Sequence, residues 1–131
     1  MQARLSATFE VKSWEESPFD DQADLPRMTQ SLVEKSYYGD IEGKSTTQWL
    51  MAYAEDGSAT FVGLERISGR FDGEPGSLVL QHVGSYAEGS AKASLAVVEG
   101  LGSGALASVS GTGEFLANPT GSVDLNLSSS S

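Results

Sequence analysis

Glu65 and His82, the single histidine of the chain, are the residues whose types could do acid–base chemistry. A carboxylate beside an imidazole fixes the tautomer of the ring and raises its basicity, whereas burial opposes a charge on either group. A pair of this kind can serve as general acid and base. Whether the two side chains meet depends on the strands that carry them.

The first of these strands is defined by the turn at residues 55–57. Glu-Asp-Gly is typical of a three-residue hairpin loop with glycine in the left-handed conformation. In that register Trp49 lies opposite Gly63, and Glu65 is on the inward face. A two-residue Asp-Gly turn would shift the register by one residue and turn Arg66 inward instead. We favour the three-residue loop.

The next strand is expected to fold back at a turn around residues 73–74, which pairs Glu65 with His82 and Phe61 with Tyr86. A further turn at residues 88–89 gives the same inward face, and agreement between turns strengthens the interpretation. The pair would then be surrounded by side chains suited to an apolar ligand. This candidate ligand-binding wall consists of Trp49, Met51, Tyr53, Phe61 and Tyr86.

The strand at residues 29–38 allows two orientations. One turns Glu34 inward, where a second carboxylate beside Glu65 would be a functional signature. The other turns Lys35 inward together with Val33 and Tyr37, and we favour it because that face is more apolar. Lys35 would neutralise Glu65 and favour a structural role, yet it could also bind the anionic headgroup of a ligand.

The chain shows the alternation of strands and no convincing helical period. Residues 5–11 read as a first strand, and EESPFDDQADLPR reads as an acidic loop at about residues 15–27. Residues 42–53, 107–115 and 122–127 complete the pattern. We expect an all-β domain at residues 1–127, an eight-stranded antiparallel up-and-down barrel, followed by a disordered serine tail at 128–131.

Composition excludes several classes of function. Eighteen acidic and eight basic residues give a net charge of −10, which disfavours nucleic acid as a partner. With no cysteine, one histidine and no ordered calcium loop, we expect no metal and no cofactor. The chain has no signal-peptide pattern and no apolar run long enough for a membrane span, so we expect a cytoplasmic protein with no membrane partner.

Several motifs resemble those of a known family. WLMAYAEDGSATFVGLER and GSLVLQHVGSY, together with ATFEVKSW, GDIEG and GTGEF, are similar in order and spacing to a bacterial family of uncharacterised proteins. That family is structurally similar to the allene oxide cyclase barrel. The resemblance implies a calycin-like barrel, often oligomeric, and no assigned activity. No cavity motif of the cyclases matches, so their catalytic residues are not carried over.

Three functions remain open on this basis. The first is a barrel that binds a small apolar or amphipathic molecule, with Glu65 and His82 as polar contacts. The second is an enzyme of the isomerase or cyclase type that uses the same pair. The third is a structural protein with a filled barrel. Outward Val62, Leu64 and Val79 would need cover, which favours a homo-oligomer, a dimer or a trimer, over a monomer with scattered surface aliphatics.

Overall fold

The computed structural model describes residues 2–117 and 120–129, which form nine β-strands. The strands are β1 (Gln2–Pro18), β2 (Met28–Gly39), β3 (Ile41–Tyr53), β4 (Ala59–Phe71), β5 (Glu74–Ala87), β6 (Ser90–Val97), β7 (Ser103–Gly104), β8 (Val109–Ala117) and β9 (Gly121–Ser129). In this part of the chain no helix is long and apolar enough to cross a membrane.

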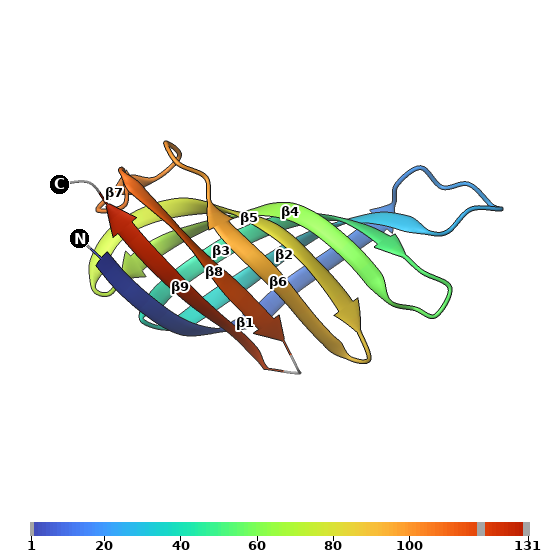
Figure 1. Ribbon diagram of the computed structural model, residues 1–131, viewed down its shortest axis with the longest axis horizontal. Coiled ribbons are helices and arrows are strands. Elements are labelled where there is room, and N and C mark those ends of the chain that lie inside the picture. The colour runs from blue at the N-terminus through green and yellow to red at the C-terminus, as the bar shows by residue number, and fades with distance from the viewer. Residues whose placement is uncertain (1, 118–119, 130–131) are drawn as a thin grey trace.

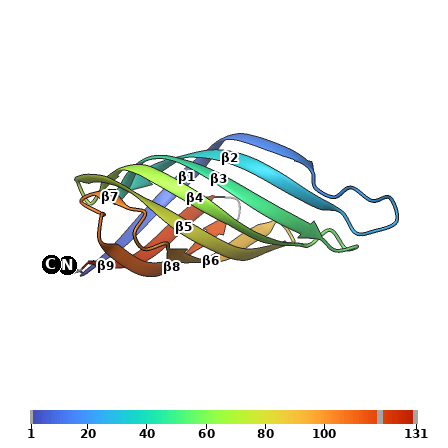
Figure 2. The same ribbon diagram turned by 90° about the horizontal axis from the view of Figure 1, so that it is seen from above.

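Eight of the strands close into an antiparallel barrel. The neighbours run from β4 through β3, β2, β1, β9, β8 and β6 to β5, and β5 pairs with β4 to close the ring. The two-residue strand β7 pairs beside the start of β5. Figures 1 and 2 show the closed wall, with both chain termini at one end. The expected eight-stranded up-and-down barrel is therefore confirmed.

The β3–β4 hairpin has the predicted register. The backbone N–H of Ala54 donates to the carbonyl of Ser58 at 2.8 Å, and Gly57 adopts a left-handed φ of +88°. Trp49 consequently lies opposite Gly63, as expected. A Cβ atom on Gly63 would stand 2.6 Å from Cδ1 of Trp49, so the glycine makes room for the indole.

The predicted register of the β4–β5 hairpin is wrong by two residues. Phe71 pairs with Glu74 across a two-residue turn at Asp72 and Gly73, whose φ angles of +52° and +83° are both left-handed. Asp-Gly suits such a turn because both residues tolerate this conformation. A shift of two residues keeps the same inward face, but His82 now pairs with Gly63 rather than with Glu65.

The first strand is longer than predicted and contains a bulge. Residues 15–18 of the expected loop belong to β1, which pairs with β2 as far as Pro18 and Thr29. The register shifts between Val11 and Ser13, so one extra residue is inserted. Because of this insertion, Trp14 pairs with inward-facing Val33, and even-numbered residues point inward beyond the bulge. The strict alternation read from the sequence does not reveal that change of parity.

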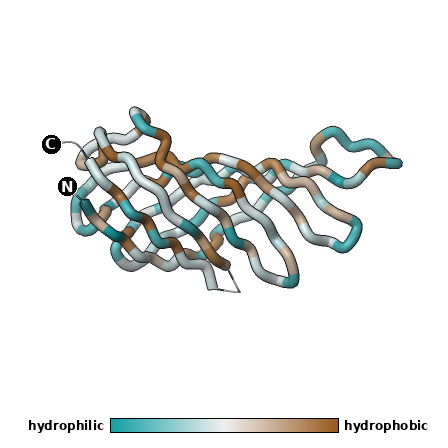
Figure 3. Tube along the Cα trace, viewed as in Figure 1, coloured by the Kyte–Doolittle hydropathy of each residue, from teal (hydrophilic) through white to brown (hydrophobic). Residues whose placement is uncertain are grey.

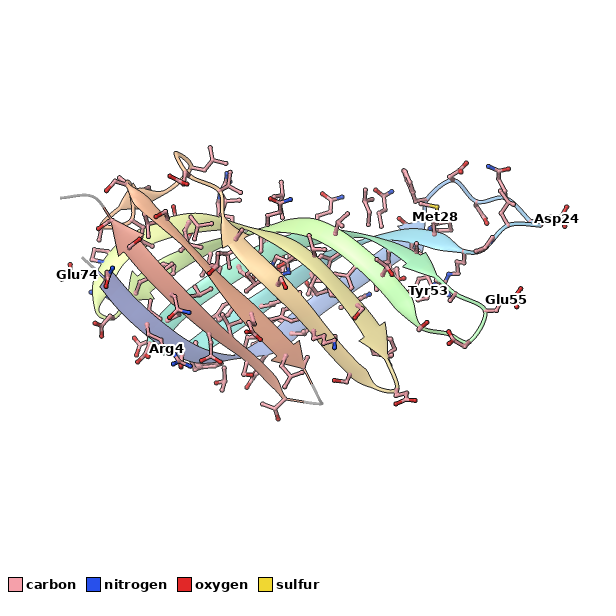
Figure 4. All side chains as sticks on the ribbon, viewed as in Figure 1. Arg4, Asp24, Met28, Tyr53, Glu55 and Glu74 are labelled. Carbon is pink, nitrogen blue, oxygen red and sulfur yellow. The ribbon has the colours of Figure 1, made fainter. Side chains whose placement is uncertain are left out.

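The two ends of the barrel differ. The β1–β2 loop carrying Asp24 and the turn carrying Glu55 project from one end, and the β4–β5 turn with Glu74 lies at the other (Figure 4). The C-terminal part of the chain also adds to the core. In the segment that contains β7, Leu106 is 2% exposed, and its side chain joins the apolar core. β9 runs to Ser129, so two serines of the expected tail are strand residues, and Ser130 and Ser131 lie outside the described residues.

Hydropathy alternates along the strands, as Figure 3 shows, because successive side chains point to opposite faces of the wall. The inward set forms one apolar core. Val79, expected on an outward patch, is instead 5% exposed. The segment between β6 and β8 runs along this part of β5, where β7 pairs with Gly76 and Ser77.

We predict that Gly63→Ala destabilises the barrel by about 1–3 kcal/mol, the usual cost of overpacking a core. The added methyl group would overlap the backbone carbonyl oxygen of Gln48 and lie 2.6 Å from Cδ1 of Trp49, so it would displace both the β3 backbone and the indole ring. Urea unfolding followed by tryptophan fluorescence measures the change. Ser68→Ala, an exposed position on the same strand, is the control, and equal stability of the two variants would contradict the prediction.

Candidate functional site

Glu65 on β4 and His82 on β5 meet inside the barrel, where they are 1% and 0% exposed. Nε2 of His82 lies 2.8 Å from Oε1 of Glu65. The two residues are diagonal neighbours rather than a directly opposed pair, since His82 faces Gly63. Long side chains bridge such diagonal positions across a sheet. The pair named from the sequence therefore forms despite the error in register.

Trp49 determines the tautomer of His82. Its indole Nε1–H donates to Nδ1 of His82 at 3.3 Å. Because an indole nitrogen can only donate, Nδ1 must be the accepting nitrogen of the ring. The proton is then on Nε2 and is donated to Glu65. Both nitrogens of the neutral imidazole are engaged.

The second carboxylate oxygen of Glu65 is also fully bonded. The hydroxyl groups of Tyr37 and Ser45 each donate to Oε2 at 2.6 Å. Lys35, on β2 beside Tyr37, places its Nζ atom 3.5 Å from the same oxygen. The orientation favoured from the sequence, with Val33, Lys35 and Tyr37 inward, is confirmed by their exposures of 0–2%. Glu34 is on the outer face.

Lys35 differs from the other members of this cluster, because its Nζ atom is fully buried and its contact with Oε2 of Glu65, at 3.5 Å, is an ion pair too long for a good hydrogen bond. Aromatic rings surround it instead. Their centroids lie at 4.4 Å for Phe9, 5.1 Å for Trp49 and 5.2 Å for Phe115. Ring faces attract a cation but satisfy none of its three N–H donors. The ammonium group therefore has unused hydrogen-bonding capacity.

The charges of the cluster depend on one another. Burial opposes ionisation of Glu65, but the charge of Lys35 and the hydrogen bonds from His82 and Ser45 outweigh it and lower the pKa to about 2. Burial lowers the pKa of Lys35, and the charge of Glu65 partly restores it. The pKa of Tyr37 is raised well above its usual value by burial and by Glu65. Glu65 is thus an anion paired with a buried cation.

The candidate ligand-binding residues separate into two groups. Trp49, Phe61 and Met51 are buried in the core, and the rings of Trp49 and Phe61 are 5.0 Å apart. Tyr53 and Tyr86 lie further along their strands, towards the end of the barrel with the β1–β2 loop, which we call the loop end. The Tyr53 hydroxyl donates to Glu16 there. Tyr86 is 40% exposed. Of the five predicted wall residues, Trp49, Phe61 and Met51 are therefore buried in the core, and Tyr53 and Tyr86 lie apart from them.

A second polar cluster, at the loop end, was missed because Glu16 was assigned to a loop. Its Oε2 atom accepts hydrogen bonds from Tyr53 at 2.5 Å and from Thr29 at 2.6 Å. Nε1 of Trp14 donates to the other oxygen at 3.1 Å, and Arg27 lies 3.6 Å away. Recognition of the β1 bulge from the sequence would have been needed to place Glu16 inside.

Beside these clusters β1 extends beyond the end of its neighbour β9. β1 pairs with β9 only as far as Phe9 and Gly121, while β1 continues to Pro18. Beyond that point Val11 and Trp14 pair with the inward-facing β2 residues Lys35 and Val33. Their own side chains are nevertheless 48% and 45% exposed. Both are inner-face residues in contact with solvent, so they mark an opening.

The interior next to Glu65 is packed with side chains. The rings of His82 and Phe115 lie 5.5 Å apart, and those of Trp14 and Trp49 are also 5.5 Å apart. A hollow of about 780 Å³ lies along β2, β3 and β4, and its lining includes Lys12, Lys44 and Arg66 as well as Lys35 and Ser45. Neither Glu65 nor His82 lines it. Within the described residues, no three acidic or histidine side chains converge as a metal site would require.

We predict that Glu65→Gln destabilises the protein by about 3–5 kcal/mol, because it leaves the Lys35 ammonium buried without its counter-charge. The double variant Glu65→Gln/Lys35→Met should cost less than the single change, since it removes both charges. Urea unfolding of the wild type and both variants gives the three free energies. A double variant less stable than Glu65→Gln would show that the two charges do not stabilise each other.

We also predict an acid-dependent loss of stability that comes from Glu65. Its pKa falls from the usual 4.5 to about 2 on folding, so the unfolded chain binds more protons between these values. The free energy of unfolding therefore falls as the pH drops from about 4.5 towards 2, by on the order of 3 kcal/mol. Unfolding midpoints against pH should show this excess in the wild type relative to Glu65→Gln/Lys35→Met. Parallel curves would contradict it.

Comparison with known proteins agrees with the geometry. The structure is similar to the crystal structure of a protein of unknown function from the DUF3224 family of Shewanella oneidensis MR-1, with a TM-score of 0.79 and 25% sequence identity over 100% of both chains. No curated protein matches the sequence. A family model described as a protein of unknown function (DUF3224) matches residues 5–128. The chain therefore belongs to the DUF3224 family, in agreement with the expected family of uncharacterised barrel proteins.

Proposed function

We propose that this protein is a binding barrel for a small amphipathic molecule, and that the Lys35 ammonium group donates a hydrogen bond to an oxygen atom of that ligand. The observation that carries the proposal is the unused hydrogen-bonding capacity of Lys35 Nζ inside the barrel. An unsatisfied buried donor costs about 1–3 kcal/mol, and more when it is charged. A ligand oxygen would remove that cost.

The position of Lys35 supports access from outside. Val11 pairs with Lys35 across the β1–β2 ladder, and it is 48% exposed. Trp14, the next inward residue of β1, is 45% exposed, and its ring contacts that of Trp49 at a tilt of 56°. Movement of these two β1 side chains would open a path to the ammonium group. β1 has no β9 partner here, so its side chains can move without breaking that ladder.

The surroundings define the class of ligand. Phe9, Trp49 and Phe115 offer ring surfaces to an apolar body. Glu65 already supplies a negative charge 3.5 Å from Lys35, so a carboxylate ligand would meet like-charge repulsion. A neutral acceptor, such as the carbonyl oxygen of a ketone or aldehyde, avoids that repulsion. We therefore favour a neutral carbonyl compound over the anionic headgroup.

The enzyme alternative gains less from this geometry. Proton transfer by the Glu65–His82 pair needs a group that is free to exchange a proton with a substrate. Both nitrogens of His82 are engaged, and the pKa of Glu65 is about 2. In the proposed function these two residues act as positioning residues, which hold Trp49 and Lys35 in place.

We expect 2-decanone to bind about tenfold or more tightly than decane. This ratio of affinities corresponds to the free energy of one hydrogen bond to a charged donor. It should also bind more tightly than decanoate. Both tryptophans of the chain, Trp14 and Trp49, lie on the proposed path, so intrinsic fluorescence can follow the titration.

Two variants complete the test. Glu65→Gln/Lys35→Met removes the donor while keeping the interior neutral, and it should abolish the preference for the ketone. Lys44→Met changes a lysine on the outer wall and should leave that preference intact. Equal affinity for the ketone and the alkane, or no binding by the wild type, would contradict the proposal and favour a filled structural barrel.

A further inference from the structure

The outer wall of the barrel has a broad face without charged side chains. Outward residues of β2 to β6 align in two neighbouring rows across the ladders. We call these two rows the uncharged face. The first row is Gln30, Leu50, Val62, Val83 and Ser94, and the second is Leu32, Gln48, Leu64, Gln81 and Ala96.

Large aliphatic side chains on this face are exposed. Leu50, Val62 and Val83 are directly in register on three adjacent strands and are 42%, 45% and 53% exposed. Leu64 lies beside them at 54%, and Leu32 at 40%. Single exposed aliphatics are ordinary on a monomer, but a contiguous set marks an interaction surface.

Charges border the uncharged face instead of entering it. The next row towards the β4–β5 turn contains Glu34 and Arg66, and Lys92 lies in the row on the other side, towards the β1–β2 loop. On β8, Glu114 continues the first row beyond Ser94. A chain with 18 acidic and eight basic residues has thus kept a wide part of its wall free of both. Depletion of charge is the compositional mark of an interface core.

We propose that two copies of this chain pack through their uncharged faces, about a twofold axis, to form a homodimer. A net charge of −10 on each copy opposes association, and this face brings two copies together without setting like charges side by side. The outward rows of the opposite wall include Glu114, Asp124 and Arg4, so they do not offer a second face of the same kind. Identical faces meeting on both partners make a closed dimer.

The size and polarity of the face suit this arrangement. The part of the face that one partner can contact is centred on β3, β4 and β5, because β2 and β6 carry the rows round the curve of the barrel. Three strands about 4.8 Å apart and two rows of side chains give an uncharged core of roughly 200 Å². A standard interface buries about 800 Å² per partner, so the bordering rows with Glu34, Arg66 and Lys92 would form its polar rim. Gln48 and Gln81 carry amide groups that can pair with their equivalents across the interface. Leu64 and Val62 lie on the central strand of the face, next to the proposed axis.

Sedimentation equilibrium at micromolar concentrations tests the proposal. We expect the mass of a dimer for the wild type and of a monomer for Leu64→Lys, which puts two like charges near the axis. The control is Leu116→Lys, an outward leucine on β8 with 48% exposure, and this variant should remain a dimer. Circular dichroism would confirm that both variants are folded.

A second experiment locates the contact. The chain has no cysteine, so Val62→Cys introduces a single thiol that meets its copy near the axis. Mild oxidation should link two chains through Val62→Cys and not through the control Leu116→Cys. A monomeric or trimeric wild type overturns the proposal, and so does a dimer that survives Leu64→Lys. Cross-linking that is equal at both positions would also overturn it.

Discussion

The ion pair between Glu65 and Lys35 is the interaction on which the interior of this barrel depends. Each charge alone would be very unfavourable inside a packed apolar core, and each stabilises the other there. The carboxylate also receives hydrogen bonds from Tyr37, Ser45 and His82, so its acceptors are satisfied by residues on β2, β3 and β5. One side chain of β4 thereby connects four consecutive strands.

The same pair explains the aromatic character of its surroundings. The ammonium group needs neighbours that tolerate a cation without competing for Glu65, and ring faces do this. Phe9 on β1 and Phe115 on β8 extend the contact to the far side of the barrel. The cluster is therefore held by strands from most of the ring. Its weakest side is at Val11, where β1 has already left β9.

Much of this arrangement follows from the sequence, and the failures have local causes. Turn chemistry at residues 55–57 gave the β3–β4 register, and apolar balance gave the orientation of Lys35. The predicted β4–β5 register was wrong because the chain makes a tight two-residue turn at Asp72-Gly73. The hydrophobic pattern does not reveal the error, since a shift of two residues keeps the same side chains on the inward face. Glu16 was misplaced because the bulge after Val11 reverses parity inside a continuous strand. Ser45 and Phe115 were not assigned to the site because only the folded barrel brings them beside Lys35.

The buried charges and the uncharged face also depend on each other through register. Successive residues of a strand point to opposite faces, so Glu65 inside requires Leu64 outside. On β4 the outward set includes the apolar Val62 and Leu64 together with Arg66 and Arg70, whereas the inward set includes Phe61, Ile67 and Phe71. Hydrophobicity therefore favours the observed register, and the buried charges add to that preference.

A slip by one residue would place Arg66 inside and leave Lys35 without its carboxylate. The polar cluster makes that alternative costly, because both cations would then be buried unpaired. The face of the proposed dimer can lie on this strand because the inner charges favour the register that turns Val62 and Leu64 outward. We infer that the buried pair is kept for this specificity as well as for any ligand, since a purely apolar interior would remove the penalty that separates the two registers.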